Sequence, residues 1–213
     1  MAIQDIDYEF LKKFKKPIII HAEHESFNIN IADKNNENNL NSINFAKKIA
    51  DLSNSKKIIL HPGCMNNENC SKENAINLIK QVNDKRIIIE NVTDDEKNHG
   101  LCKDPKEIKE FIKDANSGFC FDINHAIITA INKNEDYFKI IKEFIKLKPD
   151  HYHLSGMIFN PQKDHLSFKY SELDIKTILK LLPKDAEITL EVSTNKEDTE
   201  YDLNLIKNII KEI

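Results

Sequence analysis

Several features that mark other protein classes are scarce in this chain of 213 residues. Its apolar runs, such as residues 18–20 and 58–60, are far shorter than the ~18 residues that a membrane-spanning helix needs. Residues 1–5 lack the basic and apolar regions of a signal peptide. The four cysteines never form a Cys-x-x-Cys pair, which counts against a structural disulfide or a cysteine zinc site. We therefore expect a soluble, cytoplasmic protein with no membrane partner.

Arginine and glycine are also rare. Arg86 is the only arginine among 31 basic residues, and the formal net charge is −4. Because neutralising phosphates needs a local excess of positive charge, this balance is not typical of a nucleic-acid-binding protein, although a local patch of lysines would still permit one. The chain has only four glycines and neither a GxGxxG nor a GxxxxGK[ST] motif, which disfavours a nucleotide-binding doubly wound fold.

The chain does contain short apolar runs that recur at the spacing of a βα unit. They cover residues 17–21, 57–61, 86–90, 119–122, 151–154 and 187–191. Continuous apolar runs, rather than alternating ones, predict strands that are buried on both faces of a parallel sheet.

The segments between the runs predict helices. Asp104-Pro105-Lys106-Glu107 is a helix start, with an N-cap acid, proline at the first position and glutamate at the third. Apolar residues at helical spacing predict further helices over 135–147, 172–182 and 199–213, the last with an apolar face of Leu203, Leu205, Ile206, Ile209 and Ile210. Residues 1–16 predict a short helical lead, and the Asn-rich stretch 34–41 predicts a solvated loop. This alternation leaves a doubly wound sheet or a (β/α)₈ barrel.

Side chains that can bind metal stand at the ends of the predicted strands. They are His21, His61, Glu90, Asp122 and Glu191, and the remaining run, at 151–154, contains His151 and His153. Any one of them has a structural alternative, since a histidine there often bonds a loop and an acid often caps the next helix. Their recurrence on successive strands favours a metal site at the mouth of a barrel, because converging buried charges need pairing or a cation. Histidine and carboxylate ligands suit Zn²⁺, Mn²⁺ or Fe²⁺.

The motifs at these strand ends resemble, in order, those of the endonuclease IV family, within the xylose isomerase-like TIM barrels. The motifs are His24-Glu25-Ser26-Phe27-Asn28-Ile29-Asn30, His61-Pro62-Gly63, Ile89-Glu90-Asn91, Asp122-Ile123-Asn124-His125, His153-Leu154-Ser155, Asp164-His165-Leu166 and Leu190-Glu191. The resemblance covers roughly residues 17–193. It implies an α/β fold, a single TIM-barrel domain over residues 1–213.

The resemblance also implies a set of metal ligands, with zinc as the expected ion, in two or three copies, or manganese or another divalent ion. By this analogy Glu90 bridges two ions, of which one also binds His24 and His61 and the other binds Asp122, His153 and Glu191. A third ion would take His125, Asp164 and His165. Glu90 and Glu191 are the expected catalytic residues, and the implied reaction is hydrolysis of the phosphodiester at abasic sites, a step of DNA repair.

The chain departs from the family pattern in four places. Only six of the eight expected strands are present, and the first two are missing, so we expect an incomplete barrel. Asp164 and His165 are adjacent, where the family has Asp-x-His and Lys163 takes the place of the aspartate. Lys169-Tyr170-Ser171 replaces a Gly-Glu-Gly. The first ligand is either His21, which ends its strand, or His24, which the motif favours.

Three functions fit these observations. The first is a metal-dependent hydrolase of the endonuclease IV type, acting on DNA. The second is a sugar isomerase or epimerase of the wider superfamily, in which Glu90, Asp122, His153 and Glu191 hold one ion and the two glutamates move protons beside a carbonyl of a small sugar or sugar phosphate. The third is a degenerate barrel that binds metal or a partner without turnover. We also expect the exposed sheet edge to be covered, by a homodimer or by an N-terminal segment.

Overall fold

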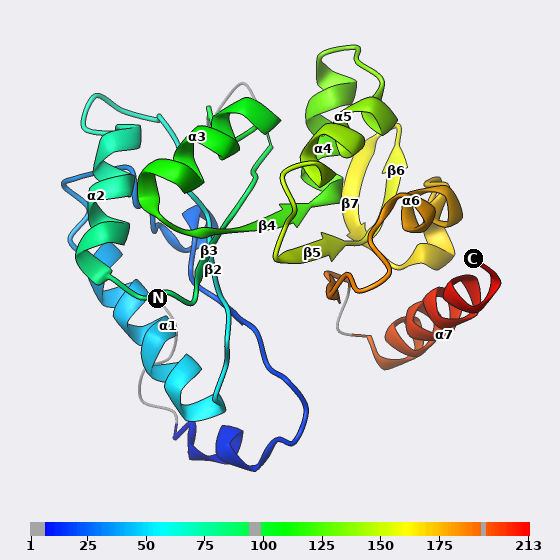
Figure 1. Ribbon diagram of the computed structural model, residues 1–213, viewed down its shortest axis with the longest axis horizontal. Helices are drawn as coiled ribbons and strands as arrows, with labels where there is room; N and C mark the ends of the chain where they lie inside the picture. Colours follow the sequence, from blue (N-terminus) through cyan, green and yellow to red (C-terminus); the bar gives the residue numbers. More distant parts are fainter. Residues whose placement is uncertain (1–6, 94–98, 193–194) are drawn as a thin grey trace. The chain divides into compact units, whose positions relative to one another are not determined.

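Short strands and helices alternate along the chain, as the apolar runs predict (Figure 1). The computed structural model describes residues 7–93, 99–192 and 195–213. The chain divides into two compact units, Met1–Cys120 and Phe121–Ile213, here called unit 1 and unit 2. The expectation of a single domain over the whole chain stays a prediction.

Unit 1 is built on parallel strands with helices between them. β1 pairs with β2, β2 with β3, and β3 with β4, all in parallel register. Figure 1 shows α2 beside α1 and α3. The elements are η1 (Glu9–Lys13), β1 (Ile20–His21), η2 (Glu25–Phe27), α1 (Asn39–Ser53), β2 (Ile58–Leu60), α2 (Lys72–Val82), β3 (Ile87–Glu90), α3 (Pro105–Ala115) and the first part of β4 (Gly118–Asp122). The helical lead is thus the 3-10 helix η1, and residues 1–6 lie outside the described part.

Alternation of side chains along the strands places apolar residues and candidate ligands on one face. Ile59, Ile88 and Cys120 form a buried apolar cluster against which Ile19 packs. Each of the first two lies two residues before a candidate ligand, His61 or Glu90, and therefore points to the same side of the sheet. The polar ends of β1–β3 are thus carried on an apolar layer.

Two helix starts in unit 1 test the sequence rules. The start at Pro105 is confirmed, since the Asp104 carboxylate accepts hydrogen bonds from the backbone N–H groups of Lys106 and Glu107. The prediction of a solvated loop over 34–41 is wrong at its end, where α1 begins at Asn39, which is 4% exposed. Its amide donates to the Asn30 and Asp33 carbonyl oxygens and accepts from Asn30 N–H, so this asparagine joins the helix to the preceding loop.

Unit 2 combines parallel strands with a separate hairpin. It contains the end of β4, α4 (Ile123–Asn132), α5 (Tyr137–Ile145), β5 (His151–Leu154), β6 (Gly156–Phe159), β7 (Gln162–Leu166), η3 (Phe168–Tyr170), α6 (Ile175–Leu181), β8 (Ile188–Leu190) and α7 (Lys196–Glu212). β5 and β8 pair in parallel, and β6 and β7 pair antiparallel. The sequence did not predict the hairpin.

A β-bulge interrupts this hairpin. Gly156 pairs with Leu166 and Ile158 with Lys163, so Asp164 and His165 together face the single residue Met157. His165 has φ = 55°, in the left-handed region. An extra residue at a bulge changes the direction in which the neighbouring side chains point. The bulge therefore decides where Asp164 and His165 lie.

The last helix buries less of its apolar face than its sequence predicts. Ile206 is buried, but Leu203 and Ile210 are 43% and 53% exposed. Instead, α7 packs on η3 through Asp202, whose Oδ1 accepts hydrogen bonds from Ser167 Oγ (2.8 Å) and Phe168 N–H (2.9 Å). The hydrogen bonds of Asp202 thus replace part of the apolar packing that the sequence predicts for this helix.

The strand order of the main sheet is β1-β2-β3-β4-β5-β8, in which every neighbour is the next strand of that sheet along the chain. This order, with a helix between successive strands, is that of a TIM barrel reduced to six strands, and it confirms the predicted fold class. Within the described ranges, no helix has both the length and the apolar character that crossing a bilayer requires.

Candidate metal centre

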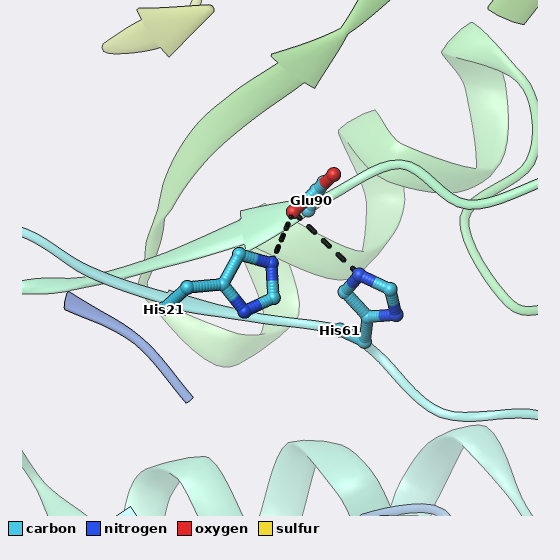
Figure 2. Close-up of side chains that lie close together, drawn as sticks. All are labelled: His21, His61 and Glu90. Atoms are coloured by element: carbon cyan, nitrogen blue, oxygen red, sulfur yellow. Dashed lines mark hydrogen bonds and ion pairs between the residues drawn. The ribbon is translucent and has the colours of Figure 1, made fainter. Parts of the chain in front are cut away.

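In unit 1, His21 and His61 converge on Glu90. The Nε2 atoms of His21 and His61 lie 3.0 Å and 3.6 Å from Glu90 Oε2. Figure 2 shows both imidazoles turned toward this carboxylate. Glu90 is 1% exposed, so its charge has lost most of its contact with water. A buried carboxylate is tolerated only with cationic or hydrogen-bonding partners.

Both nitrogen atoms of His21 face oxygen acceptors. Nδ1 lies 2.8 Å from the Ala22 carbonyl oxygen, and Nε2 lies 3.0 Å from the Glu90 carboxylate. A neutral imidazole carries a proton on only one nitrogen, so its other lone pair would face an oxygen lone pair. A metal cation between Nε2 and the Glu90 carboxylate would fit the tautomer of His21 that donates from Nδ1 to the Ala22 carbonyl oxygen.

His61 lies between two carboxylates. Its Nδ1 lies 3.1 Å from Glu25 Oε2, and its Nε2 points to Glu90. Ligand atoms on one tetrahedral zinc ion lie about 3.3 Å apart. Because the distances from Glu90 to the two histidines are close to this value, the donor set of unit 1 fits a divalent ion.

His24 belongs to a neighbouring group. His24, Glu25 and His61 offer ligand atoms within 4.8 Å of one another, and the His24 and His61 rings lie 4.5 Å apart. Burial, and then the nearby His61 and His21, lower the pKa of His24 to about 4. Burial acts to raise the pKa of Glu25, but the hydrogen bond with His61 and the charges of His61 and His24 together lower that pKa. His24 is thus neutral at pH 7, the form that binds metal.

The structure therefore groups His21, rather than His24, with His61 and Glu90. The motif pointed to His24 because of the spacing to Asn28-Ile29-Asn30. Glu25 is a residue that the sequence reasoning did not select. Its signal was its place beside His24 in that motif, but a single glutamate at the start of a short helix is common.

In unit 2, Asp122, His153 and Glu191 offer ligand atoms within 4.8 Å of one another. His153 Nδ1 lies 3.1 Å from Glu191 Oε1 and 3.9 Å from Asp122 Oδ2. Asp122 and His153 are 2% and 1% exposed. The other oxygen of Asp122 accepts a hydrogen bond from His125 N–H (2.7 Å) and caps α4, so the capping and ligand roles do not exclude each other.

The remaining candidates of unit 2 lie around the bulge. His165 Nδ1 is 3.1 Å from Asp164 Oδ1, and its Nε2 is 3.3 Å from Glu191 Oε2. Hydrogen bonds with these two carboxylates raise the pKa of His165 to about 10. Burial acts to raise the pKa of Asp164, but the hydrogen bond with His165 lowers it. The His125 ring lies 6.4 Å from that of His165. The bulge thus brings Asp164 and His165 together beside Glu191, although the residue that separates the aspartate from the histidine in the family motif is missing here.

Hydrogen bonds between polar residues join the segments of unit 2 that carry the candidate ligands. Ser155 N–H donates to Asn124 Oδ1 (2.9 Å), and the Asn124 amide donates back to the Ser155 carbonyl (3.1 Å). Ser155 Oγ accepts from His165 N–H (3.1 Å). One pleat below His153, the buried His151 contacts Thr189 Oγ1 through Nε2 (2.8 Å). Asn124 and Ser155 belong to the strand-end motifs, which was the available signal for them.

No protein-family model matches the chain, and no curated protein matches it. Solved structures match its fold. Endonuclease IV from Thermus thermophilus aligns with a TM-score of 0.76 and 17% identity, over 100% of this chain and 84% of that one. A D-tagatose 3-epimerase-like protein aligns at 0.72 and 20% identity, over 96% and 80%. AP endonuclease family 2 from Brucella melitensis aligns at 0.70 and 13% identity, over 96% and 84%. The chain thus shares the TIM-barrel fold of these three proteins.

Proposed function

We propose that the chain is a metal-dependent phosphodiester hydrolase of the endonuclease IV type that cleaves DNA at abasic sites. The observation that carries this proposal is the surplus of histidines. His21, His24 and His61 gather near Glu25 and Glu90 in unit 1, and His125 and His165 accompany Asp122, His153, Asp164 and Glu191 in unit 2. One divalent ion needs far fewer protein ligands, so these sets support more than one ion per chain.

The ligand assignments follow from the contacts within each unit. In unit 1, Glu90 and His61 would hold an ion together with His21 or His24. In unit 2, Asp122, His153 and Glu191 would hold one, and His125, Asp164 and His165 another. Zinc suits this nitrogen and oxygen donor set, and manganese is the second candidate.

Each carboxylate would have its own part in the reaction. Divalent ions bound here would polarise a phosphodiester and lower the pKa of water. Glu90, which is 1% exposed and faces Nε2 of both histidines, would orient His21 and His61. The Glu191 side chain is 22% exposed, so its carboxylate can reach a water molecule and accept the proton of the attacking water.

The test is cleavage of a fluorescein-labelled DNA duplex that carries one tetrahydrofuran abasic analogue. We expect the zinc- or manganese-loaded protein to cut the labelled strand at the analogue, and we expect EDTA to abolish the reaction. His125→Ala should slow cleavage at least 10-fold, whereas His99→Ala, an exposed histidine outside both groups, should not. A protein with two or three bound ions that leaves the duplex intact would contradict the proposal.

A sugar isomerase or epimerase is the second candidate. The single arginine and the net charge of −4 favour a small substrate over DNA, and the D-tagatose 3-epimerase-like protein has the same fold. In this case one divalent ion per chain and glutamates that move a proton beside the sugar carbonyl would suffice. Exchange of a ketohexose C–H proton in D₂O, followed by NMR, together with one ion per chain that His125→Ala does not affect, would support it.

A further inference from the structure

Glu25 contacts the side of His61 that faces away from Glu90. Glu25 Oε2 lies 3.1 Å from His61 Nδ1, and the Glu25 side chain is 26% exposed. The same oxygen is 3.9 Å from His24 Nδ1, beyond hydrogen-bonding distance. Of the two histidines beside it, Glu25 is therefore bonded to His61.

This bond decides which nitrogen of His61 is available. A carboxylate only accepts hydrogen bonds, so Nδ1 carries the proton that points to Glu25. Nε2 then presents its lone pair on the side of Glu90, 3.6 Å from Oε2. A hydrogen bond from the second ring nitrogen to a carboxylate is the common way in which proteins fix the tautomer and ring orientation of a metal-binding histidine.

The loop that carries Glu25 is itself fixed to the loop that follows His61. Asn30 Oδ1 accepts from Cys64 N–H (3.0 Å) and Ala32 N–H (3.1 Å), and Asn30 Nδ2 donates to the Cys64 carbonyl (2.9 Å). η2 is closed by the bonds from Phe27 N–H to the His24 carbonyl and from Asn28 N–H to the Glu25 carbonyl. The Asn30 side chain and the backbone hydrogen bonds of η2 thus hold Glu25 at a set distance from His61.

We propose that Glu25 is a positioning residue that holds His61 in the Nδ1-protonated form and thereby raises the metal affinity of the Glu90 group. The proposal deepens the proposed function and rests on it only in that the group binds a metal. Glu25 does not touch the ion. Its part is to keep the imidazole oriented and to increase the electron density at Nε2.

The experiment compares Glu25→Ala and Glu25→Gln with the wild-type chain. Long-range ¹H–¹⁵N NMR of the metal-free protein should show His61 protonated at Nδ1, with the signal identified by its loss in His61→Gln. Glu25→Ala should shift His61 toward a mixture of tautomers and weaken zinc binding about 10- to 100-fold, measured by competition with a chromogenic chelator. Glu25→Gln keeps an oxygen acceptor and should restore most of both. Glu37→Ala, at an exposed glutamate of the same unit, should change neither.

Two results would overturn the proposal. The first is an unchanged His61 tautomer and an unchanged zinc affinity in Glu25→Ala. The second is the loss of one whole zinc equivalent with the tautomer unchanged, because Glu25 would then be a ligand. Neither readout depends on turnover, so the proposal can fail while the hydrolase succeeds, and the reverse.

Discussion

Glu90 is the residue on which the arrangement of unit 1 depends, because both His21 and His61 direct Nε2 toward its Oε2. We predict that Glu90→Gln keeps the fold, since the amide has almost the same size, but lowers the zinc affinity of the protein at least 10-fold, because a neutral amide attracts neither a cation nor an imidazolium. Elemental analysis after dialysis against a weak chelator measures the loss. Glu37→Gln is the control, and retention of all zinc by Glu90→Gln would contradict the prediction.

Gly63 shows how closely the two loops of unit 1 approach. It has φ = +91°, and a Cβ atom there would lie 2.8 Å from Ala32 N and closer still to Asn30 Oδ1. We predict that Gly63→Ala lowers the free energy of unfolding by roughly 2–4 kcal/mol, from backbone strain and steric overlap. Urea unfolding measures it.

A double-mutant cycle separates the two causes. In Gly63→Ala/Asn30→Ala the overlap with the asparagine amide is gone, so the combined loss should be smaller than the sum of the single losses. Strictly additive losses would show that positions 63 and 30 do not interact. They would contradict the close contact between the loop that carries Glu25 and the loop that follows His61.

At the scale of elements, the attachment of α7 to η3 depends on Asp202. Burial raises the pKa of Asp202 more than the hydrogen bonds from Ser167 and Phe168 lower it, and among the described residues nothing bonds to Oδ2. The folded state therefore binds this proton more tightly than the unfolded state. The contribution to stability is complete below the unfolded pKa of ~3.9 and is lost as the pH rises through the folded pKa.

We predict that Asp202→Asn raises the free energy of unfolding at pH 7 by about 1 kcal/mol, because the amide oxygen still accepts from Ser167 and Phe168 while the buried charge is removed. The advantage should shrink as the pH falls toward 4. Denaturant unfolding at several pH values measures it, with Asp185→Asn, at an exposed aspartate of the same unit, as the control. An advantage that does not change with pH would be inconsistent with a titrating Asp202.

The sequence predicted the six main strands because each is a continuous apolar run, and burial on both faces requires that composition. It did not predict β6 and β7, since Gln162–Leu166 is polar and a hairpin with a bulge has no simple alternation. The sequence did not predict that Asn39 is buried in a helix, because an asparagine-rich stretch has the composition of a loop. Its burial depends on hydrogen bonds with Asn30, nine residues earlier in the chain.

The candidate ligands were predicted from their position at strand ends, but their partners were not. Whether His21 or His24 faces Glu90 depends on the path of the chain after β1. The spacing of a histidine from the Asn28-Ile29-Asn30 motif does not determine this path. Likewise, the contact of Asp164 with His165 depends on the left-handed conformation of His165. Such a backbone state leaves little trace in the sequence when the residue is not glycine.

At the scale of the whole molecule, β8 is the last strand of the main sheet, and among the described residues no strand pairs with its outer side. A groove lies beside it, lined by two lysines, Lys180 and Lys184, and by the apolar residues Leu179, Leu182, Pro183, Ala186, Ile188, Ile210 and Ile213. An unpaired strand next to apolar side chains is a surface that proteins usually cover. We therefore predict that two copies of the chain associate through the β8 edge.

Light scattering should then give twice the chain mass of 24.7 kDa. Ile210→Glu, in the groove and 53% exposed, should shift the protein to the monomer. Leu203→Glu is the control, because it introduces the same charge on the same helix at a position 43% exposed and outside the groove. A wild-type monomer at high concentration would contradict the prediction.

The two oxygen atoms of Glu191 face different histidines, Oε1 toward His153 and Oε2 toward His165. A cation that binds beside His153 therefore draws on the negative charge that keeps His165 protonated. By thermodynamic linkage, the bound ion lowers the proton affinity of His165 by the same factor by which the proton lowers the affinity for the ion. Uptake of a cation beside His153 would therefore be coupled to loss of the proton from His165, with negative cooperativity between the ion and the proton.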